Sequence, residues 1–302
     1  MMTPAKNSVI HRSYHDVDGH LVAADTHLLA DGRPPVVFLH GIMVDLDLAP
    51  LLFGDPTKES WIALSLPGHA PGRFRPGTHR SEIDEQLFAQ LVERPLAALL
   101  GSRKVIAAGW STGGFAALNL AVWHPERVAG VASLAGFGRV RLSGSVGWLN
   151  WVARGPLGRH CLAWGLRLAA RWPAFFWLFA RRCTARDTAV DDATIARLFT
   201  SFRGHDPDTL VDLLAMLTKL DIEERLGGIH VPAWIAGGLE DPLIRSAETR
   251  RLAGLLPNST LALYPGGHLF FCEWPGMQED FARWMMSNGL RESIPGDGHN
   301  DD

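Results

Sequence analysis

Short runs of apolar residues alternate along most of the chain with longer segments whose apolar positions recur at helical spacing. Such runs predict buried strands, and the segments between them predict helices that cover a sheet. The alternation favours an α/β fold with a mostly parallel sheet. The predicted strands are Val36–Leu39, Trp61–Leu66, Val105–Ala108, Val128–Leu134, Ala233–Ala236 and Thr260–Tyr264, and the predicted helices are Ser81–Leu100, Thr112–His124, Ser246–Leu255 and Phe270–Ser287.

Two parts of the chain depart from this alternation. Asp18-Gly19, a dipeptide typical of hairpin turns, separates two strand-like runs and predicts that the sheet begins with an antiparallel pair. Residues 139–225 contain no strand-like run and are rich in Trp and Arg, which predicts an inserted helical cap, or lid, over the carboxyl end of the sheet. The core domain is then expected to comprise residues 1–138 and 226–302.

The composition narrows the function classes. Hydrophobic residues make up 47% of the 302 residues and charged residues 20%, as in an ordinary globular protein. A net charge of −3 provides no basic excess for binding nucleic acid, and no cluster has metal-ligand spacing. The first residues show no signal-peptide pattern and the three cysteines are far apart, so we expect a cytoplasmic protein, with peripheral membrane association left open.

The segment Gly109-Trp110-Ser111-Thr112-Gly113 joins a predicted strand to a predicted helix. In the pattern G-x-S-x-G, a sharp turn exposes the serine, and the two glycines keep the turn free of clashes. The helix that follows directs its amino end at the serine, where it stabilises negative charge. The pentapeptide therefore predicts a nucleophile at Ser111, although a serine that only caps the helix fits the same pattern.

A serine nucleophile needs a base and a group that orients the base. In this kind of turn, the expected order along the chain is serine, acid and histidine. Asp241 follows one predicted strand and His268 follows the next, so both fall at the same sheet edge as Ser111. We predict the triad Ser111, Asp241 and His268, with Glu240 as the alternative acid.

Two further groups complete the predicted site. The backbone N–H groups of Ile42, which follows a strand, and of Thr112, which follows the nucleophile, are expected to form the oxyanion hole. Trp110, Met43 and Leu269 are expected to contact the substrate, although Trp110 could equally pack beside the turn. His40 is interpreted as a structural residue beneath the site. No cofactor is needed for this chemistry.

The segments "FLHGI", "LSLPGHAPGR", "GWSTGG", "GGLEDPL" and "PGGH" resemble the α/β-hydrolase superfamily over nearly the whole chain. The resemblance implies the α/β-hydrolase fold and, with an intact triad, a serine hydrolase of the esterase or lipase kind. One departure is Ser65, where family members often have aspartate, and we interpret this position as structural.

The predicted cap has an unusual charge. Residues 139–186 contain nine arginines and no Lys, Asp or Glu, together with five tryptophans. Three interpretations stay open. The segment could bind an anionic membrane surface. It could bind an acidic acyl carrier protein or an anionic group of the substrate, or its arginines could simply pair with acids of the protein itself. Cys161 and Cys183 are expected in the interior of the cap, and Cys272 in the core.

The sequence thus predicts a serine hydrolase that cleaves an ester of a small hydrophobic substrate through an acyl-enzyme. Thioester hydrolysis, acyl transfer, lactone opening and C–C bond hydrolysis use the same triad and stay open. A ligand-binding sensor with low turnover is the alternative from another class.

Overall fold

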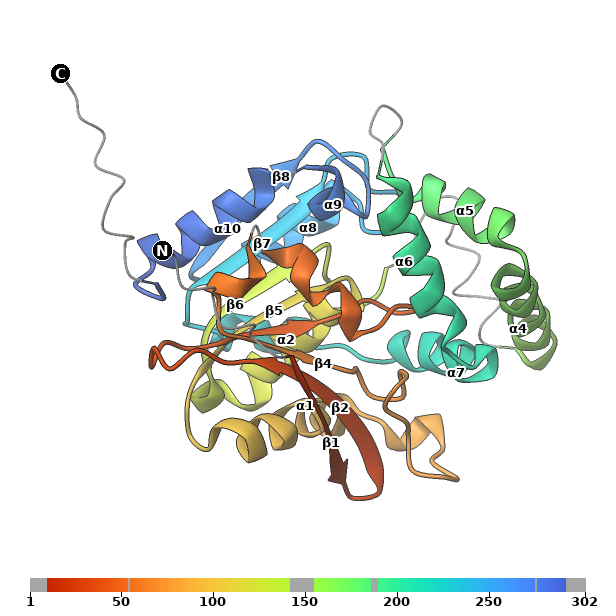
Figure 1. The fold of residues 1–302 in the computed structure, drawn as a ribbon, viewed down its shortest axis with the longest axis horizontal. Helices are drawn as coiled ribbons and strands as arrows, with labels where there is room; N and C mark the ends of the chain where they lie inside the picture. The colour runs from red at the N-terminus through yellow and green to blue at the C-terminus, as the bar shows by residue number, and fades with distance from the viewer. Residues whose placement is uncertain (1–9, 54, 142–154, 186–189, 275, 292–302) are drawn as a thin grey trace, which may run out of the picture.

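The computed structural model describes residues 10–53, 55–141, 155–185, 190–274 and 276–291. Within these residues eight strands form one sheet in the order β1-β2-β4-β3-β5-β6-β7-β8 (Figure 1). The strands are β1 (His11–Val17), β2 (His20–His27), β3 (Val36–Leu39), β4 (Trp61–Leu64), β5 (Val105–Trp110), β6 (Val128–Leu134), β7 (Ala233–Gly238) and β8 (Ser259–Tyr264).

The pairing of the strands follows from their burial. Strands β3, β4, β5 and β7 are buried at every position, which is typical of parallel strands covered on both faces. From β4 to β8 all neighbouring strands are parallel. The hairpin of β1 and β2 is antiparallel, and β2 also runs antiparallel to β4. The predicted mostly parallel α/β sheet and its antiparallel start are therefore confirmed.

Helices cover both faces of this sheet (Figure 1). Helices α1 (Glu85–Leu100) and α2 (Thr112–Trp123) lie on one side, where α2 packs against β5 and β6. Helix α8 (Ser246–Gly254) packs against β7 and β8. Helix α10 (Gly276–Ser287) lies on the opposite side from α1 and α2, and its Phe281 stacks on Trp234 of β7. The carboxyl ends of the strands are left for other segments to cover.

One predicted helix is wrong as a single element. The predicted helix Phe270–Ser287 is divided into α9 (Phe270–Glu273) and α10. The sequence contains the reason, because Pro275 lies between the two helices and proline disfavours continuous helix through the preceding residue. The other predicted helices and strands differ from the observed ones by a few residues at their ends.

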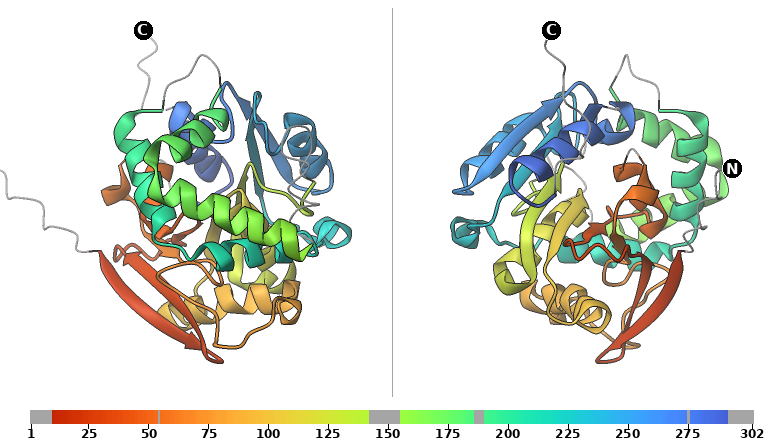
Figure 2. Two further views of the ribbon diagram at one scale, coloured as in Figure 1. Left: turned by 90° about the vertical axis from the view of Figure 1, so that its right-hand side faces the viewer. Right: turned by 60° about the vertical axis from the view of Figure 1, so that its left-hand side comes forward.

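In the described part of the chain between β6 and β7, the α-helices are α4 (Pro156–Arg171), α5 (Pro173–Arg182), α6 (Asp192–Arg203) and α7 (Pro207–Leu217). They pack against one another and lie together on one side of the molecule (Figures 1 and 2). Asp191 and Asp206 cap the amino ends of α6 and α7 through their carboxylates. The division of the chain into core and cap at residues 139 and 225 stays a prediction.

None of the helices in the described residues is long and apolar enough to cross a membrane. This agrees with the sequence of α4 and α5, in which arginines interrupt the apolar residues.

Candidate active site

Ser111 lies at the turn between β5 and α2 with a φ of 57° and a ψ of −116°. A positive φ is strained for a residue with a side chain, and the surrounding contacts must hold it. The Ser111 N–H donates to the carbonyl oxygen of Leu134 at 2.8 Å. A Cβ added to Gly109 would lie 2.0 Å from the carbonyl oxygen of Gly113, and one added to Gly113 would lie 1.8 Å from that of Leu39. Both glycines are therefore required for this turn.

Asp241 and His268 form a buried pair beside Ser111. Asp241 Oδ2 accepts a hydrogen bond from His268 Nδ1 at 2.7 Å, and the two residues are 5% and 4% exposed. The other oxygen, Oδ1, accepts from the N–H groups of Leu243 and Ile244 at 2.7 and 2.9 Å. Because Nδ1 is engaged by the carboxylate, Nε2 is the nitrogen left for a substrate or for Ser111. Glu240, the alternative acid, is exposed to solvent.

The loop that carries His268 is held by the end of helix α5. The His268 N–H donates to the carbonyl oxygen of Cys183 at 2.6 Å. Glu273 supports the same junction, because its carboxylate accepts from the N–H of Gly267 at 3.0 Å and from that of Ala185 at 2.8 Å. These contacts join the loop after β8 to the chain that leaves α5, and no sequence pattern indicated them.

His40 fixes the loop after β3. Its Nε2 accepts from the N–H of Leu66 at 2.9 Å, so its Nδ1 carries the proton and donates to the carbonyl oxygen of Gly41 at 2.8 Å. Full burial lowers the pKa of His40 to about 3, and the ring is neutral near pH 7. The interpretation of His40 as structural agrees with these bonds.

The predicted oxyanion donors, Ile42 and Thr112, line the same pocket as Ser111. Ile42 follows the loop that His40 holds, and Thr112 begins α2. Among the residues that the structure describes, neither backbone N–H has a hydrogen-bond partner. Two unpaired donors next to a serine at a helix amino end are what a developing oxyanion requires.

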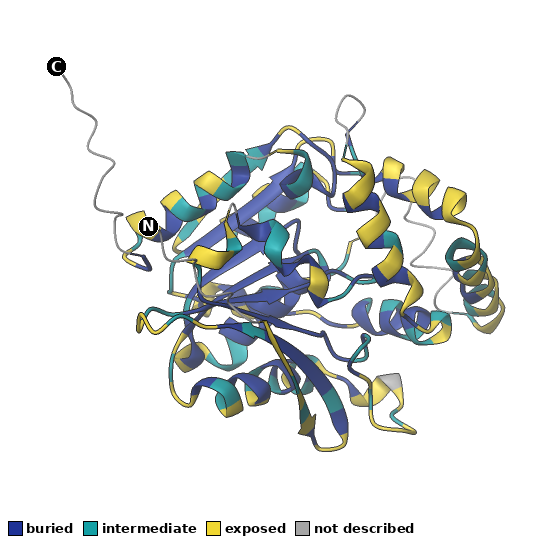
Figure 3. Cartoon of the chain, viewed as in Figure 1, coloured by how far each residue is buried: buried dark blue, intermediate teal, exposed yellow. Residues whose placement is uncertain are grey.

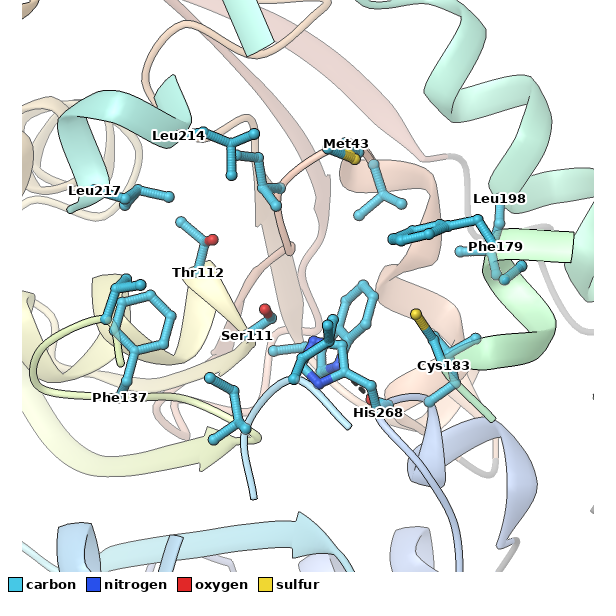
Figure 4. A pocket seen from close by; sticks show the side chains of 18 of the residues that line it. Met43, Ser111, Thr112, Phe137, Phe179, Cys183, Leu198, Leu214, Leu217 and His268 are labelled. Atoms are coloured by element: carbon cyan, nitrogen blue, oxygen red, sulfur yellow. Dashed lines mark hydrogen bonds between the residues drawn. The ribbon is translucent and has the colours of Figure 1, made fainter. Parts of the chain in front are cut away.

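A pocket opens over Ser111 and His268 (Figure 4). Among the residues that the structure describes, no Arg, Lys, Asp or Glu side chain lines it, and the polar groups that do come from Ser111, Thr112, Thr218, Cys183 and His268. Core residues supply one wall, including the predicted Met43, Trp110 and Leu269. The helices between β6 and β7 supply the other wall with Phe176, Phe179, Ala180, Leu198, Leu214 and Leu217. The site is therefore suited to an apolar substrate portion.

Trp110 has both of the roles considered for it, contact with the pocket and packing beside the turn. It lines the pocket, and it is also packed beside the turn with 6% exposure. Its Nε1 donates to the carbonyl oxygen of His268 at 2.8 Å, and the two rings lie 5.1 Å apart. Trp110 thus holds the backbone of His268 as well as contacting the cavity.

The cysteines behave differently from one another. The prediction that Cys161 lies inside the cap is wrong, because this residue of α4 is exposed. Cys183 is buried and lines the pocket. Burial, with further contributions from Asp241 and Glu273, raises the pKa of Cys183 to about 12, so it stays a thiol and is no rival nucleophile to Ser111.

No sequence pattern indicated a contact among three histidines, His40, His69 and His205. The His69 ring lies 4.9 Å from that of His40 and 5.4 Å from that of His205. Burial lowers the pKa of both His69 and His205. His205 follows α6, so this contact joins the helices between β6 and β7 to the loops after β3 and β4.

The arginines of the inserted segment divide into two groups. In the first group, Arg139 pairs with Asp221 and Arg141 pairs with Glu223. Arg159 pairs with Asp212, and Arg167 pairs with Asp208. Arg171, Arg181 and Arg182 have no acidic partner among the described residues. Arg154 and Arg186 lie outside the described residues. None of the described arginines lines the pocket.

Ser65, the departure from the family pattern, is buried at the end of β4. Its Oγ accepts from the N–H of Ala23 on β2 at 2.8 Å. Within the described residues, no group of three or more His, Cys, Asp or Glu side chains could hold a metal ion.

Comparison with known proteins assigns the family. The model of the alpha/beta hydrolase family matches residues 36–284. The chain belongs to the alpha/beta hydrolase family. The resemblance found in the sequence is thereby confirmed, and with it the hydrolase class.

Relatives of this hydrolase differ in the substrates for which they are named. "Putative carbamate hydrolase RutD" of Caulobacter sp. (strain K31) is 28% identical over 57% of this chain and 61% of that relative, which is less than two thirds of its length. "Pimeloyl-[acyl-carrier protein] methyl ester esterase" of Neisseria meningitidis is 27% identical over 71% of this chain and 78% of the relative. The solved enol-lactonase of Burkholderia xenovorans LB400 is 17% identical, with a TM-score of 0.70 over 92% of this chain and 99% of its own, and shows the shared fold.

Proposed function

We propose that this hydrolase cleaves a carboxylic ester whose acyl or ring-bearing part is hydrophobic. The observation that carries the proposal is the uncharged, apolar pocket that opens on Ser111 and His268, with Asp241 bonded to the far side of the histidine. An apolar pocket with a few polar groups at one end is suited to hold a hydrophobic substrate and present one bond to a nucleophile.

In the first step, His268 acts as the base. A serine hydroxyl is a weak nucleophile, so His268 Nε2 removes its proton as Ser111 Oγ attacks the substrate carbonyl carbon. Asp241 holds the histidine with the proton on Nδ1 and stabilises the imidazolium that forms. The bonds from Leu243 and Ile244 to Asp241 keep the carboxylate in place during this step.

The negative charge formed on the carbonyl oxygen is stabilised by the backbone. The N–H groups of Ile42 and Thr112 are the donors, and the amino end of α2 adds its favourable field. Donors of this kind are fixed before the reaction, so little reorganisation is needed when the charge develops.

The second half of the reaction repeats the proton transfers. His268 gives its proton to the leaving alcohol, which departs and leaves an ester between Ser111 and the acyl group. Water then attacks this ester with His268 as base, and the carboxylic acid is released. No cofactor takes part in this scheme.

The same acyl-enzyme permits related reactions. Thioester hydrolysis, acyl transfer, lactone opening and C–C bond hydrolysis differ from ester hydrolysis in the leaving group or in the acceptor. Among the activities for which relatives are named, the apolar pocket favours the ester and lactone classes over a small polar carbamate. A low-turnover ligand-binding sensor is the remaining alternative, and tight binding beside very slow turnover would favour it.

A chain-length panel of p-nitrophenyl esters, from acetyl to palmitoyl, tests the proposal. We expect turnover to increase with acyl length over the shorter members, because each added methylene enters an apolar pocket. Ser111→Ala should lower kcat by about 10⁴-fold or more. Full esterase activity in Ser111→Ala would refute the proposed chemistry, and the absence of turnover on every ester would favour the sensor.

A further inference from the structure

Helices α4 and α5 carry several large apolar residues that are exposed to solvent. Figure 3 shows exposed residues along both helices. On α4, Leu157 is 78% exposed and Trp164, two turns later, is 64% exposed. At the junction of the two helices, Trp172 stacks on Phe175 with ring centroids 5.8 Å apart. We name this surface the α4–α5 face, and its apolar members are Leu157, Trp164, Trp172, Phe175, Leu178 and Phe179.

Helix α5 has one side that is buried against the protein, so the exposed apolar residues belong to its other side. Phe176, Ala180 and Cys183 recur at helical spacing and are buried against the rest of the protein. Phe175 and Leu178, each 55% exposed, lie on the other side of the helix. Helix α5 is therefore apolar on both sides, whereas a helix at a solvated surface normally has a polar outer side.

The charge of the α4–α5 face is positive. Residues 155–182 contain no Asp, Glu or Lys, and Arg171, Arg181 and Arg182 have no acidic partner among the described residues. Arg181 instead lies over the ring of Trp177 at 3.9 Å. The whole chain has a net charge of −3, so this positive charge is a local property of the two helices.

The combination of exposed Trp, Phe and Leu with arginines that lack an acidic partner in the described part of the chain matches an anionic membrane surface. The apolar rings can enter the boundary between headgroups and acyl chains, while the guanidinium groups pair with lipid phosphates. A second copy of this chain fits less well, because a twofold interface would bring two surfaces of the same positive charge together. An acidic protein would pair with the arginines but would not by itself account for the outward Trp and Phe rings.

The α4–α5 face lies next to the pocket, because helix α5 also contributes to the pocket wall. Phe176, Phe179 and Ala180 of α5 line the pocket over Ser111, and Phe179 is also 44% exposed. Helix α5 thus carries exposed residues and also lines the pocket, where Figure 4 shows Phe179.

We propose that the α4–α5 face binds a membrane surface that contains anionic lipid, and that a lipophilic ester reaches Ser111 from that lipid past Phe179. The second half of this proposal rests on the proposed esterase function. The first half does not, since it concerns binding alone.

Vesicle flotation separates the two halves. The protein is mixed with vesicles of phosphatidylcholine alone, or of phosphatidylcholine with phosphatidylglycerol, and binding is measured for wild type and for Ser111→Ala. We expect both proteins to bind only the vesicles with phosphatidylglycerol. Binding by Ser111→Ala shows that attachment needs no turnover, so failure of the esterase proposal and failure of the membrane proposal give different results.

Two double variants test the face itself. Arg171→Glu with Arg182→Glu should weaken binding by about thirtyfold or more, because each arginine near an anionic surface contributes a factor of about five. Phe175→Ser with Leu178→Ser should weaken it by about tenfold through lost apolar burial. None of these four residues lines the pocket, so hydrolysis of a water-soluble short ester should equal that of wild type.

Matched substitutions elsewhere serve as controls. Arg250→Glu changes an exposed arginine of α8, and Tyr14→Ser removes a 53% exposed aromatic ring from β1. Both should bind vesicles as wild type does. With a long-chain ester dissolved in the vesicles, only the variants of the α4–α5 face should lose turnover.

Absent vesicle binding by wild type, or equal binding by the face variants, overturns the proposal. Two results would also assign the face to another partner. One is a wild-type dimer, without vesicle binding, that the same substitutions convert to monomer. The other is retention on an immobilised acidic acyl carrier protein without vesicle binding.

Discussion

The backbone N–H of His268 donates a 2.6 Å hydrogen bond to the carbonyl oxygen of Cys183, the residue that follows helix α5. The proposed catalytic base is therefore attached through its main chain to a helix of the inserted segment. Glu273 reinforces the attachment by accepting from Gly267 on one side and from Ala185 on the other. The position of His268 thus depends on contacts outside the loop that carries it.

Glu273→Gln should lower kcat on a soluble ester by about tenfold to a hundredfold, because small displacements of a catalytic group are costly. The Gly267 and Ala185 N–H groups bond to different carboxylate oxygens of Glu273, and the NH2 group that replaces one of these oxygens in glutamine cannot accept a hydrogen bond. Steady-state kinetics across pH tests this, with Glu279→Gln on α10 as the control. An unchanged kcat for Glu273→Gln would contradict a positioning role.

Asp241→Asn should lower kcat by about 10⁴-fold, because the amide favours the wrong tautomer of His268 and cannot stabilise its charged form. The neighbouring exposed Glu240 provides the matched control, and Glu240→Gln should retain wild-type kcat. Kinetics of both variants on one ester decide between the two acids. A large loss in Glu240→Gln beside a small one in Asp241→Asn would reverse the assignment.

Gly113→Ala should destabilise the fold by about 3 kcal/mol or more, because the new Cβ would lie 1.8 Å from the carbonyl oxygen of Leu39, which is backbone and cannot move aside cheaply. Gly165→Ala on α4 meets no atom within 4 Å and should stabilise its helix by about 0.5–1 kcal/mol. Urea unfolding measures both. Equal stability of the two variants would argue against the tight turn at Ser111.

The contact among His40, His69 and His205 predicts acid sensitivity. Burial lowers the pKa of all three below the ordinary value of 6.5, so below that pH the unfolded chain binds protons that the native protein does not. The free energy of unfolding should therefore fall as the pH decreases from about 6.5 toward about 3, by up to about 1.4 kcal/mol per pH unit for each histidine kept neutral. Asp45, whose pKa burial raises, acts in the opposite sense at more acidic pH.

Urea unfolding between about pH 7.5 and pH 5.5 tests this dependence. His205→Gln should show a smaller decrease in stability over this range than wild type, because one buried titrating group is gone. His11→Gln, which changes an exposed residue of β1, should match wild type. A His205→Gln slope equal to that of wild type would exclude His205 from the effect.

The sequence was sufficient for the sheet because its parallel strands are apolar on both faces and stand out as unbroken runs. Once the strands are known, the loops after β7 and β8 can be placed too, because parallel strands bring their carboxyl ends to one edge of the sheet. Asp241 and His268 then fall beside each other in the structure, as their order along the chain suggested.

Contacts between distant segments could not be predicted from pattern. The bond from His268 to Cys183 uses main-chain atoms, which leave no mark on residue type. His69 and His205 lie far apart in the sequence, and either alone resembles an ordinary loop residue. Cys161 was placed inside the protein because cysteine is usually buried, but here its side of α4 faces solvent.

The pocket wall has two origins, and this has an evolutionary consequence. Ser111, Asp241 and His268 all follow strands of the sheet, whereas Phe176, Leu198 and Leu214 come from the segment inserted between β6 and β7. Mutations in the insertion can reshape the cavity without altering the turn at Ser111 or the carboxylate beside the histidine. Substrate range can therefore drift, or be redirected by exchange of one segment between paralogues, while the reaction itself is inherited unchanged.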